Sequence, residues 1–452
     1  MHDQFFQAPS WSFWALSGHR DWFLALTERA EPAMRGPNQV AWYARLEDDL
    51  DNIRAAFEWS MDQGQTDVAM RLACALGQFW ILEGHLTEGR ELFARALGGA
   101  VAGAPALRAR AAAWAASLAN DQSDYESGRR LAEESLTAFR AVGDQQGIGF
   151  ALLVLGNRSM ALDDPKTAMR QYAEGLHHFR VAESRIDIAW ALNKLGHASW
   201  AVGDYDKAIR QLGDGRDLYD ELGDRKGVSS ALQLLGQVAL SKGDLTLASE
   251  CLGQSLAIFR QVSDVYKVCL GLYLQAVVAR YEKKYSHASS LLDESISRLH
   301  ELGEKQLACY CLQEQGTLAW LQGNISDASK VLKQAVTVSF EVGDRWCLTK
   351  CLEAVGGVCS AKGELIWAAK VLGSAERMRA ETGSPMDLYE RYAYVAQLSM
   401  LQAELNEADL KHAWEAGKAL PVEDVVKSLA ELLGRLGVTP DTNEASGKTP
   451  TQ

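Results

Sequence analysis

The chain has 452 residues, 47% of them hydrophobic, so it is long enough and apolar enough to build one or more buried cores. Its 46 basic and 59 acidic residues give a formal net charge of −13, which disfavours nucleic acid or an anionic membrane as the main partner. The start lacks a basic segment followed by an apolar core, and the eight cysteines have no framework spacing. We therefore expect a reduced, cytoplasmic protein without membrane contact.

Proline is rare in the middle of the chain. Only Pro165 lies between Pro105 and Pro385, and this stretch is rich in Ala, Leu, Glu and Arg. Because proline removes a backbone donor and clashes with the preceding helical turn, its scarcity predicts helix throughout. The expected fold class is all-α.

The sequence repeats itself with a period of about 40 residues. Glycines share one register at Gly156, Gly196, Gly236, Gly316 and Gly356. Each is followed by a turn such as Gly203-Asp204 and then by a small residue such as Ala208. We expect the first glycine to let two helices approach closely, the turn glycine to end helix A, and the Asp to cap helix B.

This pattern resembles the tetratricopeptide repeat, whose usual period is about 34 residues. The resemblance implies a right-handed superhelical solenoid of helix hairpins, with the extra residues lengthening helix B and the loop after it. Such hairpins bury their apolar faces only by stacking. We expect an N-terminal helical cap over 1–65, about eight helix pairs over 66–384, a C-terminal cap over 385–437 and a disordered tail over 438–452.

A second resemblance lies at the ends of the array. The runs Asp51-Asn52-Ile53-Arg54-Ala55-Ala56-Phe57-Glu58-Trp59 and Gly84-His85-Leu86-Thr87-Glu88-Gly89-Arg90 are similar to a junction in bacterial signal-transduction ATPases of the STAND type, including LuxR-type regulators with MalT-like repeats. There the junction opens a repeat sensor after nucleotide-binding and winged-helix domains. Leu372-Gly373-Ser374-Ala375-Glu376 near the C-terminal end is similar too.

The chain lacks the motifs of the catalytic parts of that family. It has no Gly-x-x-x-x-Gly-Lys-Ser/Thr phosphate loop and no basic helix-turn-helix after residue 435. We therefore expect the sensor part alone, as a split-gene product, a remnant or a free-standing scaffold. No metal or other cofactor is expected.

A cluster of cysteines leaves one chemical alternative open. Cys309, Cys311, Cys347, Cys351 and Cys359 fall within two repeat units. They could make an all-helical enzyme or a metal- or redox-sensing site, although buried thiols commonly fill tight contacts between helices.

Repeats of this kind bind through the concave face that the A helices line. The resemblance maps inward positions that alternate between amides and aromatic side chains, and the predicted groove residues are Asn157, Trp190, Asn193, His197, Trp200, Gln233, Gln237, Tyr273, Arg280, Tyr281, Tyr310, Gln313 and Trp320. Amides on a solvated helix face have no reason in side-chain packing to recur, so the pattern favours binding. Amides grip a peptide backbone because they donate and accept together.

The leading functional hypothesis is therefore a non-catalytic binding scaffold of a bacterial signalling or transcription-regulatory system. Its partner would be a protein segment or a small-molecule effector in the groove, with a separate ATPase or DNA-binding chain as a further partner. Direct binding to DNA is the weaker hypothesis, because the net charge and the missing recognition helix oppose it.

Overall fold

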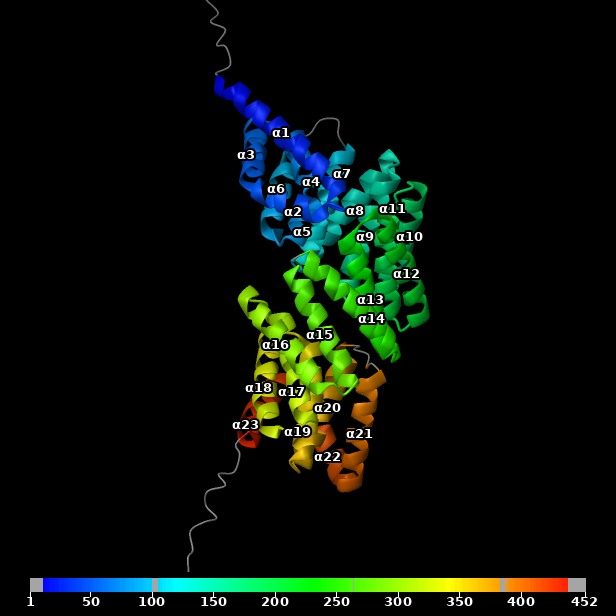
Figure 1. Cartoon of the computed structure of the whole chain (residues 1–452), viewed down its shortest axis with the longest axis vertical. Helices are drawn as coiled ribbons and strands as arrows, with labels where there is room; N and C mark the ends of the chain where they lie inside the picture. Colours follow the sequence, from blue (N-terminus) through cyan, green and yellow to red (C-terminus); the bar gives the residue numbers. More distant parts are fainter. Residues whose placement is uncertain (1–10, 100–104, 263, 383–385, 387, 438–452) are drawn as a thin grey trace, which may run out of the picture. The chain divides into compact units, whose positions relative to one another are not determined.

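The computed structural model describes residues 11–99, 105–262, 264–382, 386 and 388–437, and every element in this part of the chain is an α-helix (Figure 1). The all-α prediction is confirmed. Residues 1–10 of the predicted cap and the predicted tail 438–452 lie outside the described residues. The chain divides into two compact units, Met1–Leu235 and Gly236–Gln452, and the division falls inside one helix.

Unit 1 begins with six helices that surround a compact aromatic core. Phe57, Phe79, Trp80 and Phe93 are almost fully buried in it. The helices are α1 (Trp11–Ala33), α2 (Gln39–Asp48), α3 (Leu50–Asp62), α4 (Thr66–Ala75), α5 (Gly77–Leu82) and α6 (Leu86–Gly98).

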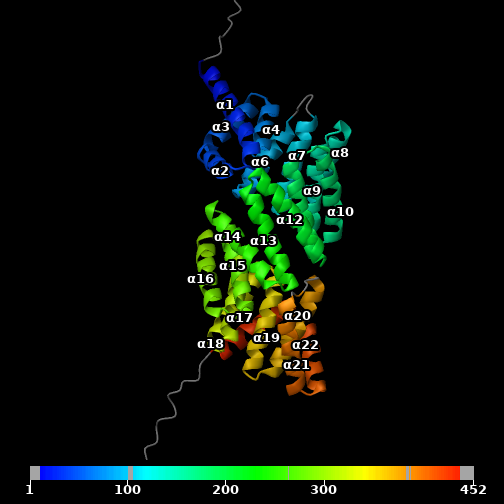
Figure 2. The ribbon, with the colours of Figure 1, turned by 45° about the vertical axis from the view of Figure 1, so that its right-hand side comes forward.

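Regular hairpins then follow in unit 1, and Figures 1 and 2 show their consecutive helices side by side. They are α7 (Pro105–Asp121) with α8 (Tyr125–Val142), α9 (Gln145–Ala161) with α10 (Pro165–Val181), and α11 (Arg185–Ala201) with α12 (Tyr205–Leu222). The unit boundary lies in α13 (Arg225–Lys242).

Unit 2 repeats the same hairpin pattern and closes with three more helices. Its hairpin helices are α14 (Leu245–Gln261), α15 (Val265–Tyr281), α16 (Tyr285–Leu302), α17 (Lys305–Leu321), α18 (Ile325–Glu341), α19 (Arg345–Ala361) and α20 (Leu365–Thr382). The closing helices are α21 (Leu388–Glu404), α22 (Glu407–Ala419) and α23 (Val422–Leu436). In both units each hairpin contacts the next, as a tetratricopeptide-like solenoid requires.

The turn chemistry expected from the sequence is present. Gly203, Gly243 and Gly323 adopt positive φ values of 82°, 86° and 79° after their A helices. The Asp204 side chain then accepts a hydrogen bond from the backbone N–H of Lys207 and caps α12, and Asp244 caps α14 in the same way. The prediction for these turns is confirmed.

The glycines at the helix crossings are required by close approach. A Cβ added at Gly196 would lie 2.5 Å from Leu212 Cγ, and one at Gly316 would lie 2.6 Å from Leu332 Cγ. Real Cβ atoms do not come so close to other carbons. The early glycine therefore sets the distance between helices A and B, as predicted.

The expected location of the extra residues in each repeat was partly wrong. Only 182–184 connect α10 to α11, and only 223–224 connect α12 to α13, so the loop after helix B is not lengthened. The regular A and B helices have 17 or 18 residues each. The extra residues of the 40-residue period therefore lie in the helices themselves. Longer helices also bury more surface between neighbouring hairpins.

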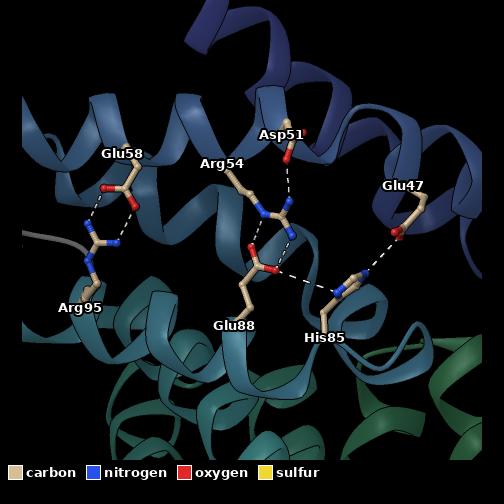
Figure 3. A network of polar contacts seen from close by, with 7 residues as sticks. All are labelled: Glu47, Asp51, Arg54, Glu58, His85, Glu88 and Arg95. Carbon is tan, nitrogen blue, oxygen red and sulfur yellow. Dashed lines mark hydrogen bonds and ion pairs between the residues drawn. The ribbon is translucent and has the colours of Figure 1, made fainter.

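The two junction motifs contact each other in unit 1 (Figure 3). The Arg54 guanidinium of α3 makes two parallel contacts with the Glu88 carboxylate of α6, 2.6 Å from Nε and 2.7 Å from Nη2, and a third with Asp51 at 2.6 Å. His85 Nε2 lies 3.1 Å from Glu47 Oε2. The Arg54–Glu88 bonds fix α6, the first helix after the Gly84-His85 turn, against α3, and the His85–Glu47 contact joins the turn to α2.

No helix in the described ranges is both long and apolar enough to cross a membrane.

Candidate functional site

In unit 1 the inner helices are contacted by the chain's own N-terminal turn, which joins α1 to α2. The Arg35 guanidinium lies 2.6 Å from the Asp187 carboxylate at the start of α11, and its centre lies 5.7 Å from the centroid of the Trp190 ring. Gln39 Nε2 donates to Asp224 Oδ1 at 2.9 Å, and Gln39 Oε1 accepts from the backbone N–H of Lys226. The turn is therefore held on α11 and on the start of α13.

The Arg35–Asp187 pair is electrostatically coupled. Burial by itself would raise the pKa of Asp187, but the Arg35 charge and hydrogen bonds from Ser184 and Gln146 hold that pKa below its ordinary value. Asp187 is thus a carboxylate at neutral pH, and its charge is compensated.

Several predicted groove residues of unit 1 contact side chains of their own or neighbouring hairpins. Trp190 packs near Phe150 and Arg35, and the His197 and Trp200 rings lie 5.7 Å apart. Asn157 Oδ1 accepts a hydrogen bond from the Tyr172 hydroxyl at 2.9 Å. Asn157 therefore supports its own hairpin.

In unit 2 the inner helices α15, α17 and α19 form a pocket together with α21. The pocket has about 80 Å³ of free volume. Five predicted groove residues line it, namely Tyr273, Arg280, Tyr281, Gln313 and Trp320. Helix α21 contributes Tyr389, Glu390, Ala393, Tyr394 and Gln397 to the opposite wall.

Two predicted residues of unit 2 lie outside this pocket. The Tyr310 hydroxyl donates to Asp344 Oδ1 at 3.1 Å, although the Tyr310 ring still lies 6.0 Å from that of Tyr273. Gln237 is half-buried, and its backbone carbonyl accepts from the Ser241 hydroxyl.

The charged side chains of the pocket form buried or partly buried ion pairs. Arg280 is paired with Glu314, whose side chain is 3% exposed, and the Arg280 guanidinium lies over the Tyr281 ring at 4.1 Å. Lys350 Nζ lies 2.5 Å from Glu390 of α21. Each of these cations already faces a carboxylate.

A third ion pair lies beside the first two. The pKa shifts around it show that the site is shielded from water. Arg379 Nη2 is 2.6 Å from Glu353 Oε1. Burial raises the pKa of Glu353 in spite of the opposing Arg379 charge, and burial raises the pKa of Tyr394 to about 12. Polar interactions in such an environment are stronger than in water.

The expectation that the repeating amides are solvated was wrong for three of them. Asn193, Gln233 and Gln313 are only 8%, 4% and 6% exposed. Gln313 Nε2 donates to Thr317 Oγ1 at 2.9 Å, and Gln233 Nε2 has no hydrogen-bond partner among the described residues. The physical reason is that inward positions near the middle of an A helix are covered by neighbouring hairpins, so helical register alone does not show solvent access.

The cysteine cluster has the properties of a core. Cys309, Cys311, Cys347, Cys351 and Cys359 are fully buried. Burial raises the pKa of the Cys311 thiol and that of the Cys359 thiol to about 12. Because the thiolate is the reactive and metal-binding form, this environment opposes redox or metal chemistry. Among the residues described, no group of three or more His, Cys, Asp or Glu side chains could hold a metal ion.

Comparison with known sequences identifies the repeat. The tetratricopeptide-repeat family profile matches residues 187–261, so this segment has the sequence of tetratricopeptide repeats. Proteins of Mycobacterium bovis and Mycobacterium tuberculosis named as HTH-type transcriptional regulators are 33% identical over 146 residues. That match covers 30% of this chain and 16% of each relative, so the chain aligns with about a sixth of their length.

Solved structures share the fold. A Rap protein complexed with competence and sporulation factor superposes with a TM-score of 0.58 at 11% identity, over 82% of this chain and 99% of that one. A STAND protein with a tetratricopeptide-repeat sensor from Pyrococcus horikoshii gives 0.54 at 13% identity, over 84% of this chain and 55% of that one. NprR in complex with its cognate peptide NprX gives 0.50 at 15% identity, over 73% of this chain and 93% of that one.

Sequence reasoning missed two contacts to A helices, one within each unit. Arg35 in the N-terminal turn and Tyr389-Glu390 in α21 were assigned only to caps. For α21, the sequence feature that could have indicated such a contact is the aromatic-acidic pair Tyr389-Glu390 at the start of the helix. Most of this helix is exposed. Nothing in the sequence pattern alone marked Arg35.

Proposed function

We propose that this tetratricopeptide-repeat chain is a non-catalytic regulatory sensor that binds a protein segment in the pocket of unit 2. The observation that carries the proposal is the pocket itself. It is lined by the aromatic residues Tyr273, Tyr281 and Trp320 together with polar residues such as Gln313. Ligand sites commonly combine apolar walls with a few placed polar groups.

The chemistry of the pocket favours a peptide over a small anion. Arg280 and Lys350 each already face a carboxylate, so an anionic ligand would have to displace Glu314 or Glu390. A peptide side chain instead gains from stacking on aromatic rings and from the amide of Gln313. The Rap and NprR structures, which share this fold, hold a competence factor and a cognate peptide.

The regulatory output is also part of the proposal. The chain is similar in sequence to a part of HTH-type transcriptional regulators, and it shares its fold with a STAND protein that has a repeat sensor. We propose that it works in the cytoplasm and passes its signal to an ATPase or DNA-binding domain. In this proposal 1–65 form the junction, 66–384 the sensor array and 385–437 the C-terminal cap.

The proposal is tested by peptide capture. The full chain is immobilised, exposed to the peptide fraction of its host's lysate, and the retained peptides are identified by mass spectrometry. We expect Trp320→Ala to lose the specific peptides at least ten-fold, because the indole forms one wall of the pocket.

The matched control is Trp346→Ala in α19, since this Trp is 41% exposed and does not line the pocket. Equal capture by wild type and both variants would contradict a binding role for the pocket.

A further inference from the structure

Helix α21 closes one side of the unit 2 pocket with one of its faces. The residues that it places there, Tyr389, Glu390, Ala393, Tyr394 and Gln397, recur at the spacing of one side of a helix. A segment that follows the repeats in sequence therefore lies where a tetratricopeptide array would hold a ligand.

Two anchors at the start of α21 carry most of the specific contact. The Tyr389 ring is stacked on Tyr281 with centroids 4.4 Å apart and planes 24° apart, and its hydroxyl donates to the Gly243 carbonyl at 3.2 Å. Next to it, Glu390 supplies the carboxylate that faces Lys350 at 2.5 Å. This end of the pocket thus binds an aromatic residue followed by an acidic one.

The remainder of α21 is held weakly. Leu401 is its one buried residue among those described, while Tyr392 and Val395 are 63% and 52% exposed. Gln397 Oε1 is buried without a hydrogen-bond partner in the described part of the chain. A helix with few buried apolar contacts and an unsatisfied polar atom opens at low free-energy cost.

We infer that α21 is an internal ligand of the unit 2 pocket, and that the partner is a helical peptide segment with the same aromatic-acidic pair, which binds by displacing α21. The inference rests on the proposed function, because it assigns both the partner class and the regulation of the same pocket. As a tethered competitor, α21 acts at an effective concentration in the millimolar range. A partner therefore binds only when it fits better than α21 or when α21 is released.

The inference is tested on the full chain with a fluorescent synthetic peptide of residues 386–404. We expect the double variant Tyr389→Ala/Glu390→Ala to bind this peptide at least ten-fold more tightly than wild type, because its own α21 no longer competes. The matched control is Tyr392→Ala/Glu404→Ala, which changes the same residue types at exposed positions of α21 and should bind like wild type.

Charge reversal tests the register of binding. The Tyr389→Ala/Glu390→Ala variant is called the weakened chain. It should bind the peptide that carries Glu390→Lys at least ten-fold more weakly than the unchanged peptide. Adding Lys350→Glu to the weakened chain should restore the binding of the Glu390→Lys peptide. The inference is overturned if the weakened chain, with unchanged helical circular dichroism, binds the peptide no better than wild type. It is equally overturned if a scrambled peptide binds as well.

A measurement on unmodified protein covers the case in which the variants do not fold. An excess of isotope-labelled 386–404 peptide should speed hydrogen exchange of the chain's own α21 amides at least three-fold and leave those of α19 unchanged. Unchanged exchange in α21 would overturn the inference. If instead α21 is displaced by its peptide but Trp320→Ala keeps every captured partner, the proposed function fails while the occupancy of the pocket by α21 stands.

Discussion

Two glycines show that the space around a residue decides whether a larger side chain can replace it. Gly196 and Gly213 both lie inside helices of unit 1, but a Cβ at Gly196 would clash with Leu212, whereas a Cβ at Gly213 would meet nothing within 4 Å.

We expect Gly196→Ala to destabilise the protein by about 1–3 kcal/mol, because the two helices must separate. Gly213→Ala should instead stabilise it by about 0.5–1 kcal/mol through a lower backbone entropy. Thermal unfolding followed by circular dichroism measures both, and a loss of stability in both variants would contradict the assignment of the crossing.

The Arg35–Asp187 pair gives a pH dependence at the same scale. The pKa of Asp187 is depressed in the folded chain, so the carboxylate contributes stability above its unfolded value of about 4, and this contribution is lost as the pH falls through the folded pKa. We expect Asp187→Asn to cost about 1–3 kcal/mol at pH 7 and much less at pH 3.

Urea unfolding of wild type and variant at both pH values measures that difference. Glu174→Gln, at a half-exposed ion pair of the same unit, is the control and should cost little at either pH. An equal cost of Asp187→Asn at pH 3 and pH 7 would show that the pair does not hold the turn.

At the scale of one element, a B helix such as α14 depends on the residue that caps its start. Asp244 Oδ1 accepts from the backbone N–H of Leu247 at 3.0 Å and so satisfies one of the free donors at the start of α14. We expect Asp244→Ala to cost about 1 kcal/mol and Asp244→Asn to cost much less, because Asn caps equally well. Chemical unfolding distinguishes them, and an equal cost would mean that charge rather than the hydrogen bond matters.

At the scale of the whole molecule, the reactivity of the cysteine thiols tests whether the core is closed to solvent. All eight thiols are buried in the folded chain. We expect Ellman's reagent to find no rapidly reacting thiol in native protein and eight after unfolding in guanidinium chloride. A native thiol that reacts within seconds, above all in the Cys309–Cys359 cluster, would revive the redox alternative.

The features that recur within each hairpin could be predicted from the sequence. The forty-residue register of Gly156 to Gly356, the Gly-Asp turns and the capping residues depend on backbone conformation and on contacts within one hairpin, so each could be predicted from a short segment. Five of the groove residues that line the unit 2 pocket could be predicted for the same reason, since they lie on A helices at a regular register.

The contacts that terminal segments make within each unit could be learned only from the folded chain. Arg35 meets Asp187 across more than a hundred residues of sequence, and Tyr389 meets Tyr281 in the same manner. Periodicity describes neighbours along a helix and between adjacent hairpins, and it carries no information on where a terminal segment returns. The burial of Gln233 and Gln313 was not predicted either, because spacing shows which face of a helix a residue lies on but not whether the neighbouring hairpins cover that residue.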